Sequence, residues 1–583
     1  MPSPAPGTDR PGPLMLGLGR RLLLALLVLV ALLGAAVLAL EYTGNAPDEL
    51  AELLGQGSEK QLRHPLRAAR GGPRVLVFAL DGVGDDELRA ALRSGRMPRT
   101  SALLGRETAG QPGMYEHAYA APGVLSILPS TTYAAWTSLF TGEPAGRTGV
   151  PGNEWFVREE MRFYAPAPVS LTEHEQALEV YTDQLMGTVV RVPTLYERAG
   201  VRAYVSLAAL HRGADLLTVP RPRAYGRMVR EAASGLADPD ERPSQEAYEA
   251  LDASAAESLA RSIRKRGVAD LQVVYFPGVD LYTHVAADPL NDQVRYLGEV
   301  VDPAVGALLE AYRAAGAMDS TYVLFVADHG HTPVRMDDRH ALEAEGADEP
   351  PEVLRRAGFR VRPFSLELKD KEEDYQAVVA YQGALAYVYL ADRSTCPRPG
   401  ERCDWRRPPR LEQDVLPVVR AFDAASRTGA GVPALRGSLD LIFARPRWGA
   451  AGNALPFGVW DGRRLLPVAE YLAAHPRPEL LALEPRLAGL GTGPFGHRAG
   501  DVLLLARTGL ERPIDQRFYF SVAQTSWHGS PTDQDSRIPL LIAHPGQGGA
   551  ALRDRVGQAV GPQPSQLSIT PLILHLLGRT NGS

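Results

Sequence analysis

The stretch RVLVFALDG, residues 74–82, decides the fold class of this chain. Its first part is almost entirely apolar, and an acid and a glycine follow directly. Runs of this kind are typical of a parallel strand that is buried on both faces. We therefore expect a buried strand with Asp81 at its C-terminal tip, although an acid in this place can also form a turn or cap a helix.

The same pattern recurs along most of the chain. Helical patterns separate the apolar runs, so we expect an α/β fold with one large, mainly parallel sheet and helices on both faces. This fold would form one large catalytic domain over residues 73–580, with cap-like insertions near 335–374 and 448–500. The other strand-like runs are 203–210, 271–280, 322–330, 384–391, 439–444, 501–506 and 538–543, and the helical patterns include 87–92, 246–264, 300–314 and 412–425.

The N-terminal region predicts a membrane anchor. Residues 22–40 carry no charge, and as a helix they would span about 28 Å, close to the hydrocarbon thickness of a bilayer. Arg20 and Arg21 precede this segment and acids follow it, which predicts a cytoplasmic segment 1–21, a stalk 41–72 and an extracytoplasmic body, periplasmic or extracellular. A cleaved signal peptide is the alternative.

Charge and cysteine content narrow the class of protein further. A net charge of −6 over 583 residues provides no basic surface for nucleic-acid duplexes. Cys396 and Cys403 flank a turn-rich loop, and in an oxidising compartment we expect them to form a disulfide.

The stretch STTYAAWTSLFTG, residues 130–142, places hydroxyl side chains where a helix begins. Ser and Thr there often cap the free N–H groups of the first turn. Alternatively, one of these hydroxyls is a nucleophile, because the helix dipole and a nearby cation stabilise an alkoxide. The residues of this stretch alone leave both interpretations open.

Acids and histidines follow three further apolar runs. Asp280 and His284 are one helical turn apart, Asp328 and His329 end a strand, and His528 lies in the loop SWHGSP. Since ligands of open α/β sheets lie beyond the carboxyl ends of the strands, we expect these side chains to meet Asp81 at one edge. Three carboxylates and three imidazoles suffice for two divalent ions; zinc fits best, with manganese or iron as alternatives.

The order of these motifs resembles the type I phosphodiesterase/nucleotide pyrophosphatase family of the alkaline phosphatase superfamily. The resemblance covers residues 74–578 and rests on five motifs in sequence, with SITPLILHLLG similar to the closing helix. The motifs are VLVFALDGVG, PSTTYAAWTSLFTGEPAGRTGV, DLYTH, ADHGHTP and WHG.

Carried over, the resemblance implies that Asp81, Asp328 and His329 hold one metal ion in contact with a nucleophilic Thr132. Asp280, His284 and His528 would hold the other. Two cations about 4 Å apart can stabilise both oxygens of an in-line displacement at phosphorus. The implied reaction is hydrolysis of a phosphodiester or pyrophosphate, in a small-molecule or lipid substrate, through a phosphothreonine.

The chain also departs from the family pattern. The nucleophile is commonly followed three residues later by an Asn that binds phosphate, and here that position is Ala135. The backbone N–H of Thr132 or the side chain of Asn153 could replace it. His331 could face the substrate or lie in a solvated cleft, and His211-Arg212 could contact an anion. Alternatives are a phosphomonoesterase, a phosphonate or phospholipid headgroup hydrolase of the same fold, or a silent membrane-anchored interaction protein.

Overall fold

The computed structural model describes residues 58–167, 176, 180, 184–221, 245–343, 349–363, 374–446 and 456–579, which all belong to one compact unit, Leu53–Ser583. The predicted segments 1–21 and 22–40 lie outside these residues. Within the described part of the chain, no helix is both long and apolar enough to cross a bilayer.

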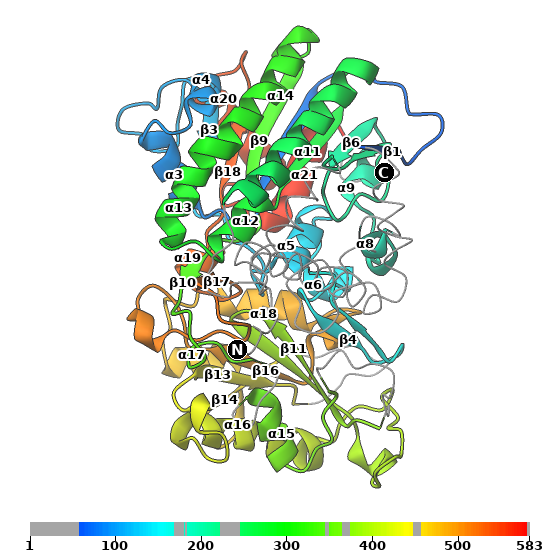
Figure 1. Cartoon of the computed structure of the whole chain (residues 1–583), viewed down its shortest axis with the longest axis vertical. Helices are drawn as coiled ribbons and strands as arrows, with labels where there is room; N and C mark the ends of the chain where they lie inside the picture. The colour runs from blue at the N-terminus through cyan, green and yellow to red at the C-terminus, as the bar shows by residue number, and fades with distance from the viewer. Residues whose placement is uncertain are drawn as a thin grey trace, which may run out of the picture. The chain divides into compact units, whose positions relative to one another are not determined.

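The first sheet has eight strands in the order β1-β7-β6-β8-β2-β9-β18-β3 (Figure 1). The strands from β7 to β9 are parallel, whereas β1, β18 and β3 join antiparallel at the two edges. Their bounds are β1 Glu59–Gln61, β2 Arg74–Leu80, β3 Ala118–Ala120, β6 Ala203–Ser206, β7 Leu216–Thr218, β8 Leu271–Phe276, β9 Thr321–Ala327 and β18 Leu540–Ala543. The edge strand β1 therefore lies within segment 41–72, for which the sequence predicts a stalk.

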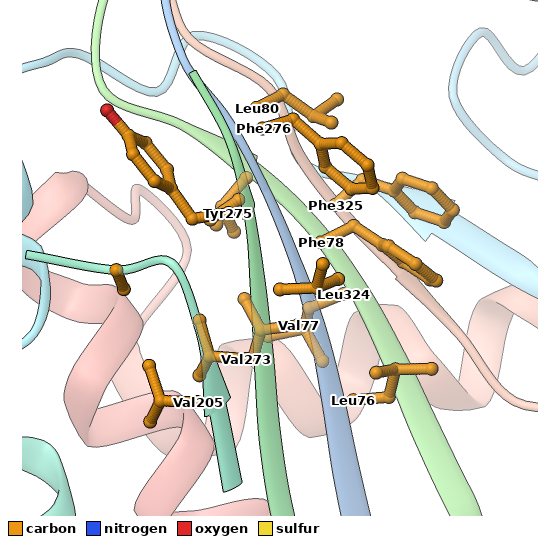
Figure 2. Packing of buried hydrophobic residues seen from close by; sticks show 14 of the residues in the cluster. Leu76, Val77, Phe78, Leu80, Val205, Val273, Tyr275, Phe276, Leu324 and Phe325 are labelled. Carbon is orange, nitrogen blue, oxygen red and sulfur yellow. The ribbon is translucent and has the colours of Figure 1, made fainter. Parts of the chain in front are cut away.

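The central strands are buried on both faces, as their apolar sequences predict. Every residue of 75–80 and of β8 and β9 is buried. Figure 2 shows the rings of Phe78, Phe276 and Phe325 together on one side of these strands, and Tyr275 on the other side. Burial of each large apolar side chain contributes about 1.5–3 kcal/mol, so this core is a main source of stability.

Helices cover the sheet, and α11 and α14 lie side by side across it (Figure 1). The helices are α3 Asp85–Arg93, α4 Pro98–Leu104, α5 Thr132–Leu139, α6 Ala145–Thr148, α8 Leu185–Val189, α9 Leu195–Ala199, α11 Gln245–Arg266, α12 Gly278–Thr283, α13 Pro289–Tyr296, α14 Asp302–Ala314, α15 Pro350–Arg356, α16 Leu416–Thr428, α17 Val468–Ala474, α18 Leu483–Gly491, α19 Asp533–Ser536, α20 Gly549–Val560 and α21 Ile569–Leu576.

The prediction of one single sheet is wrong, because the chain between β9 and β18 forms a second, antiparallel sheet of six strands. The runs 384–391, 439–444 and 501–506 belong to it. They are as apolar as the parallel strands because they are buried, and burial does not reveal strand direction. The second sheet has the order β11-β12-β16-β13-β14-β15, with β11 Ala377–Gln382, β12 Leu385–Leu390, β13 Leu439–Ala444, β14 Gly458–Trp460, β15 Leu465–Pro467 and β16 Val502–Ala506.

Two short ribbons complete the described fold. β4 Trp155–Val157 pairs with β5 Arg162–Tyr164, and β10 Thr332–Pro333 pairs with β17 Ser526–Trp527. Cys396 and Cys403 lie in the segment that follows β12, and they form a disulfide.

Candidate active site

The register of the parallel strands brings acids from distant parts of the chain to one edge of the first sheet. Leu80 of β2 pairs with Phe276 of β8 and with Ala327 of β9. The next residues, Asp81 and Asp328, therefore leave the sheet side by side, and the turn into α12 begins beside them. This edge is where open α/β sheets bind their ligands.

The first group of candidate ligands consists of Asp81, Asp328 and His329. Nε2 of His329 lies 3.5 Å from Oδ1 of Asp81 and 3.2 Å from Oδ2 of Asp328. These two carboxylate oxygens are buried and have no hydrogen-bond partner, whereas Oδ1 of Asp328 accepts the N–H groups of Gly82 and His329. Buried oxygens without partners are costly, and a cation bound between them would satisfy both.

The second group consists of Asp280, His284 and His528. Asp280 lies in α12, and His284 follows the last residue of this helix, so both side chains lie on the same side of it. Nε2 of His284 lies 3.5 Å from Oδ2 of Asp280, and Nε2 of His528 lies 3.8 Å from Oδ1 of Asp280. The rings of His329 and His528 stack 3.7 Å apart, which makes the two groups neighbours.

The three histidines of these groups orient their rings in the same way. Nδ1 of His284 lies 2.8 Å from the carbonyl of Ser526, Nδ1 of His329 3.1 Å from that of Gly330, and Nδ1 of His528 3.1 Å from that of Ser130. A carbonyl only accepts, so each Nδ1 is the protonated nitrogen and each Nε2 keeps a lone pair. Histidines that bind metals are commonly oriented by this second hydrogen bond.

Thr132 is the first residue of α5 and is partly exposed, unlike the buried residues around it. Its Oγ1 lies 3.3 Å from Nε2 of His329. None of the hydroxyls caps α5: Thr131 occupies the N-cap position without a side-chain capping bond, and Ser130 donates to the carbonyl of Ser530. The capping interpretation of this stretch therefore fails, and the Thr132 hydroxyl lies beside the first group.

The electrostatics of the cluster favour the binding of cations. Burial, together with the charges of neighbouring carboxylates, raises the pKa of Asp81, and burial likewise raises that of Asp328. Burial raises the pKa of Asp280 too, but the neighbouring imidazoles of His284 and His331 lower it overall. Burial lowers the pKa of His329 to about 4, so its ring is neutral. Neutral imidazoles and crowded carboxylates are the donors that a divalent ion requires.

Asn153 lies next to the nucleophile segment. Its Oδ1 accepts the backbone N–H of Tyr133 at 2.9 Å, and its own backbone N–H donates to Oε1 of Gln382 at 2.7 Å. With Tyr381, Gln382 and His528 it lines a hollow in the surface. Its Nδ2 makes no hydrogen bond to a described residue, so this amide can donate to a ligand there.

The possibilities raised for two further polar sites do not hold in the structure. His331 is completely buried and lies in neither a solvated cleft nor a substrate-facing surface, because the β10–β17 ribbon and α12 enclose it. His211 is buried too, with Nδ1 beside the carbonyl of Ala208. Arg212 donates to three backbone carbonyls and pairs with Glu197, so it fixes a loop and is not available for an anion.

The residues that support these ligands were not predicted from the sequence. The hydroxyl of Tyr275 donates to Oδ2 of Asp81, leaving Oδ1 for His329. Asp252 of α11 accepts the N–H of Gly278 at 2.8 Å and the hydroxyl of Tyr296 at 3.0 Å, and so anchors the start of α12. Tyr275 is a polar residue inside an apolar strand, and this position could have indicated its role. The sequence of helix α11 gives no such indication for Asp252.

A cluster of carboxylates and imidazoles next to a hydroxyl, at the edge of a parallel sheet, defines a metal-dependent hydrolase. The model of the family described as type I phosphodiesterase / nucleotide pyrophosphatase matches residues 75–401, more than half of the chain. The chain therefore belongs to this family, and its enzymatic class is that of hydrolases acting on phosphoric ester bonds. No curated protein sequence matches it significantly.

Solved structures with a similar arrangement share little sequence with this chain. One is an inactive form of murine ectonucleotide pyrophosphatase/phosphodiesterase 5 in complex with AMP, with 13% identity, a TM-score of 0.46, and coverage of 88% of this chain and 97% of that one. Another is phosphonoacetate hydrolase from Sinorhizobium meliloti in complex with phosphonoformate, with 14% identity, a TM-score of 0.45, and coverage of 89% and 100%.

Proposed function

We propose that this protein is a two-metal phosphodiesterase/nucleotide pyrophosphatase that acts through a phosphothreonine on Thr132. Asp81, Asp328 and His329 would hold one divalent cation, and Asp280, His284 and His528 the other. The main support is the position of Oγ1 of Thr132, 3.3 Å from Nε2 of His329 in a residue that is partly exposed. Zinc is the proposed metal, since the donors are carboxylate oxygens and imidazole nitrogens.

The residues of the chain define the course of the reaction. Oγ1 of Thr132 gives its proton to water and attacks phosphorus, the bond to the leaving oxygen breaks, and that oxygen takes up a proton from water. A second water then attacks the phosphothreonine, which frees Thr132 and releases the phosphate product. When bound, the cations supply charge stabilisation and lower the pKa of the attacking hydroxyl.

Asn153 is the proposed substrate-binding residue. Its Oδ1 is held by the N–H of Tyr133, so its Nδ2 group is oriented and can donate to a phosphate oxygen. This contact would replace the donor that is missing at Ala135. An oriented neutral donor contributes about 0.5–1.5 kcal/mol, and more toward a charged oxygen.

The surroundings of Thr132 favour a diester over a monoester. Thr132 lines a hollow with Tyr133, Trp136 and Tyr275, and His528 lines another with Asn153 and Tyr381. Among the described residues that line these hollows, none is a lysine or arginine. A monoester dianion would need a further cation for its second charge, whereas a diester carries only one charge.

We also propose that residues 22–40 anchor the protein, with the catalytic unit outside the cytoplasm. The apolar length of this segment and the preceding Arg20 and Arg21 support this orientation, as does a disulfide between Cys396 and Cys403. Protease treatment of intact cells and of spheroplasts tests it, because only an extracytoplasmic unit is degraded while the inner membrane remains sealed.

Replacement of the nucleophile tests the proposed function. In Thr132→Ala we expect turnover of an aryl phosphodiester to fall about a thousandfold or more, with bound zinc unchanged. Thr131→Ala is the matched control, since its Oγ1 has no hydrogen-bond partner. A panel of aryl diester, aryl monoester, dinucleotide and phospholipid substrates identifies the preferred ester. Substantial activity in Thr132→Ala would show that another group attacks phosphorus.

A further inference from the structure

His331 contacts the candidate metal centre without belonging to either group of ligands proposed above. Its Nε2 lies 2.8 Å from Oδ1 of Asp280, and its Nδ1 lies 3.1 Å from Oγ of Ser526. It is fully buried, although it follows the Asp328-His329 pair closely in the sequence. A buried imidazole at this place requires a structural or chemical explanation.

The distances to Asp280 distinguish His331 from the proposed metal ligands. Two atoms bound to one tetrahedral zinc ion at 2.0–2.1 Å lie roughly 3.3 Å apart. His284 and His528 approach the Asp280 oxygens to 3.5 and 3.8 Å, which leaves room for a shared ion. The 2.8 Å between His331 and Asp280 is instead the length of an ordinary N–H···O hydrogen bond.

We infer that His331 is a positioning residue: it donates a hydrogen bond to Oδ1 of Asp280 and so directs Oδ2 toward Nε2 of His284. The inference rests on the proposed function, because it assigns His331 to the support of the second metal group. The expected consequence is a higher metal affinity of that group, with no direct contact between His331 and the ion.

Ser526 fixes the other side of the His331 ring. The two ring nitrogens of His331 have different partners, a carboxylate oxygen of Asp280 for Nε2 and the hydroxyl of Ser526 for Nδ1. The carboxylate only accepts, so Nε2 carries the N–H of this contact, and Nδ1 faces Oγ of Ser526. Oγ of Ser526 also lies 2.8 Å from the carbonyl of Thr283, so the serine links α12, the β10–β17 ribbon and His331.

Gly82 leaves the space that this hydrogen bond needs. A Cβ at Gly82 would lie 2.6 Å from Oδ1 of Asp280 and 2.6 Å from Nε2 of His331, and the residue has a φ of +67°. The His331–Asp280 pair therefore packs directly against the backbone that follows Asp81. This contact makes the position of the second group dependent on the strand that carries the first.

Zinc titration of His331 variants tests the inference. The chelator-stripped protein is titrated with zinc in competition with a chelator of known affinity, for wild type, His331→Ala and His331→Gln. We expect two zinc ions in wild type and a loss of about 10–100-fold at one site in His331→Ala. The amide of His331→Gln can still donate to Asp280, so it should restore most of the affinity.

The matched control is His340→Ala. His340 is also buried and lies 2.6 Å from Oδ1 of Asp337, but it is not part of either metal group. Its variant should bind both zinc ions as wild type does. Thermal unfolding of each metal-free variant checks that it folds, and His331→Gln keeps the test decisive if His331→Ala does not.

The possible results separate the inference from the proposed function. Unchanged affinity in His331→Ala overturns the positioning role. Equal losses in His331→Gln and His331→Ala overturn it as well, because a ligand nitrogen would then be the part that matters. A wild-type protein that binds no zinc overturns the proposed function itself, and the inference with it.

Discussion

The two groups of the candidate centre are built in different ways. Asp81 and Asp328 lie directly beyond adjacent parallel strands, whose ladder fixes their separation. The second group depends on contacts between distant segments: His284 bonds to Ser526, and His528 bonds to Ser130. A site can thus combine one half that follows from the sheet register with another half that follows from loop packing.

The charges of the two groups differ as well. Burial and neighbouring carboxylates raise the pKa of Asp81, whereas His284 and His331 lower that of Asp280 against the effect of burial. The first group has two carboxylates and one imidazole, and the second has one carboxylate and two imidazoles. With all carboxylates ionised, the first group therefore carries two negative charges and the second group carries one.

The largest expected effect comes from removing one ligand of each group in turn. Asp328→Asn keeps the shape of the side chain, and His528→Asn keeps a donor for the carbonyl of Ser130. Each variant should lose one zinc ion and about 10²–10⁴ in turnover, since a metal contributes several kcal/mol to the transition state. Metal analysis and steady-state kinetics on an aryl diester measure both losses.

The two variants should differ in the intermediate that accumulates. The first group lies beside Oγ1 of Thr132, so Asp328→Asn should block its phosphorylation. His528→Asn should still allow attack on an ester with a good leaving group and then hydrolyse the phosphothreonine slowly. Intact-mass analysis after rapid quenching detects it. Equal amounts of phosphothreonine in both variants would mean that the groups are not specialised in this way.

A smaller effect is expected where the two groups touch. In Gly82→Ala the new Cβ would meet Asp280 and His331 at 2.6 Å, whereas at Gly95 nothing lies within 4 Å; both glycines have positive φ, +67° and +73°. Gly95→Ala should cost only backbone strain, about 1–2 kcal/mol. Gly82→Ala should in addition weaken zinc binding about 10–100-fold. Similar zinc affinities in the two variants would argue against close coupling of the groups.

The smallest expected effect on turnover comes from Asp252, which anchors α12 from behind. Burial raises the pKa of this carboxyl to about 7. The folded state therefore keeps a proton that the unfolded state releases, so this contribution to stability is complete below about pH 4 and is lost as the pH rises through 7. Asp252→Asn removes this dependence.

Urea unfolding at several pH values, in the presence of chelator, measures the difference. Relative to Asp252→Asn, wild type should lose up to about 1.4 kcal/mol of unfolding free energy per pH unit between about pH 4 and 7. A difference that does not change with pH would contradict the role of Asp252.

Much of the fold follows from local sequence signals. The strands β2, β8 and β9 have uniform apolar runs, and the acids behind them mark the sheet edge where the candidate site lies. Strand direction does not follow in this way, because β12, β13 and β16 are equally apolar and yet form an antiparallel sheet. The apolar composition of a strand indicates that it is buried, whereas its pairing partners depend on the whole chain.

The residues around the ligands were harder to predict for a related reason. His331 and Ser526 are far apart in the sequence, and only the pairing of β10 with β17 brings them together. The ligand roles of Asp81, Asp280, His284, Asp328, His329 and His528 remain predictions that the zinc titrations test.

Substitutions in the hairpin between β11 and β12 could change the substrate specificity. Ala384 donates its N–H to the carbonyl of His528, and Gln382 holds Asn153, yet the hairpin provides none of the proposed metal ligands. Tyr381 and Gln382 form one wall of the hollow beside His528. Mutant libraries at these two positions could therefore redirect the enzyme to new esters while the proposed metal ligands and Thr132 stay unchanged.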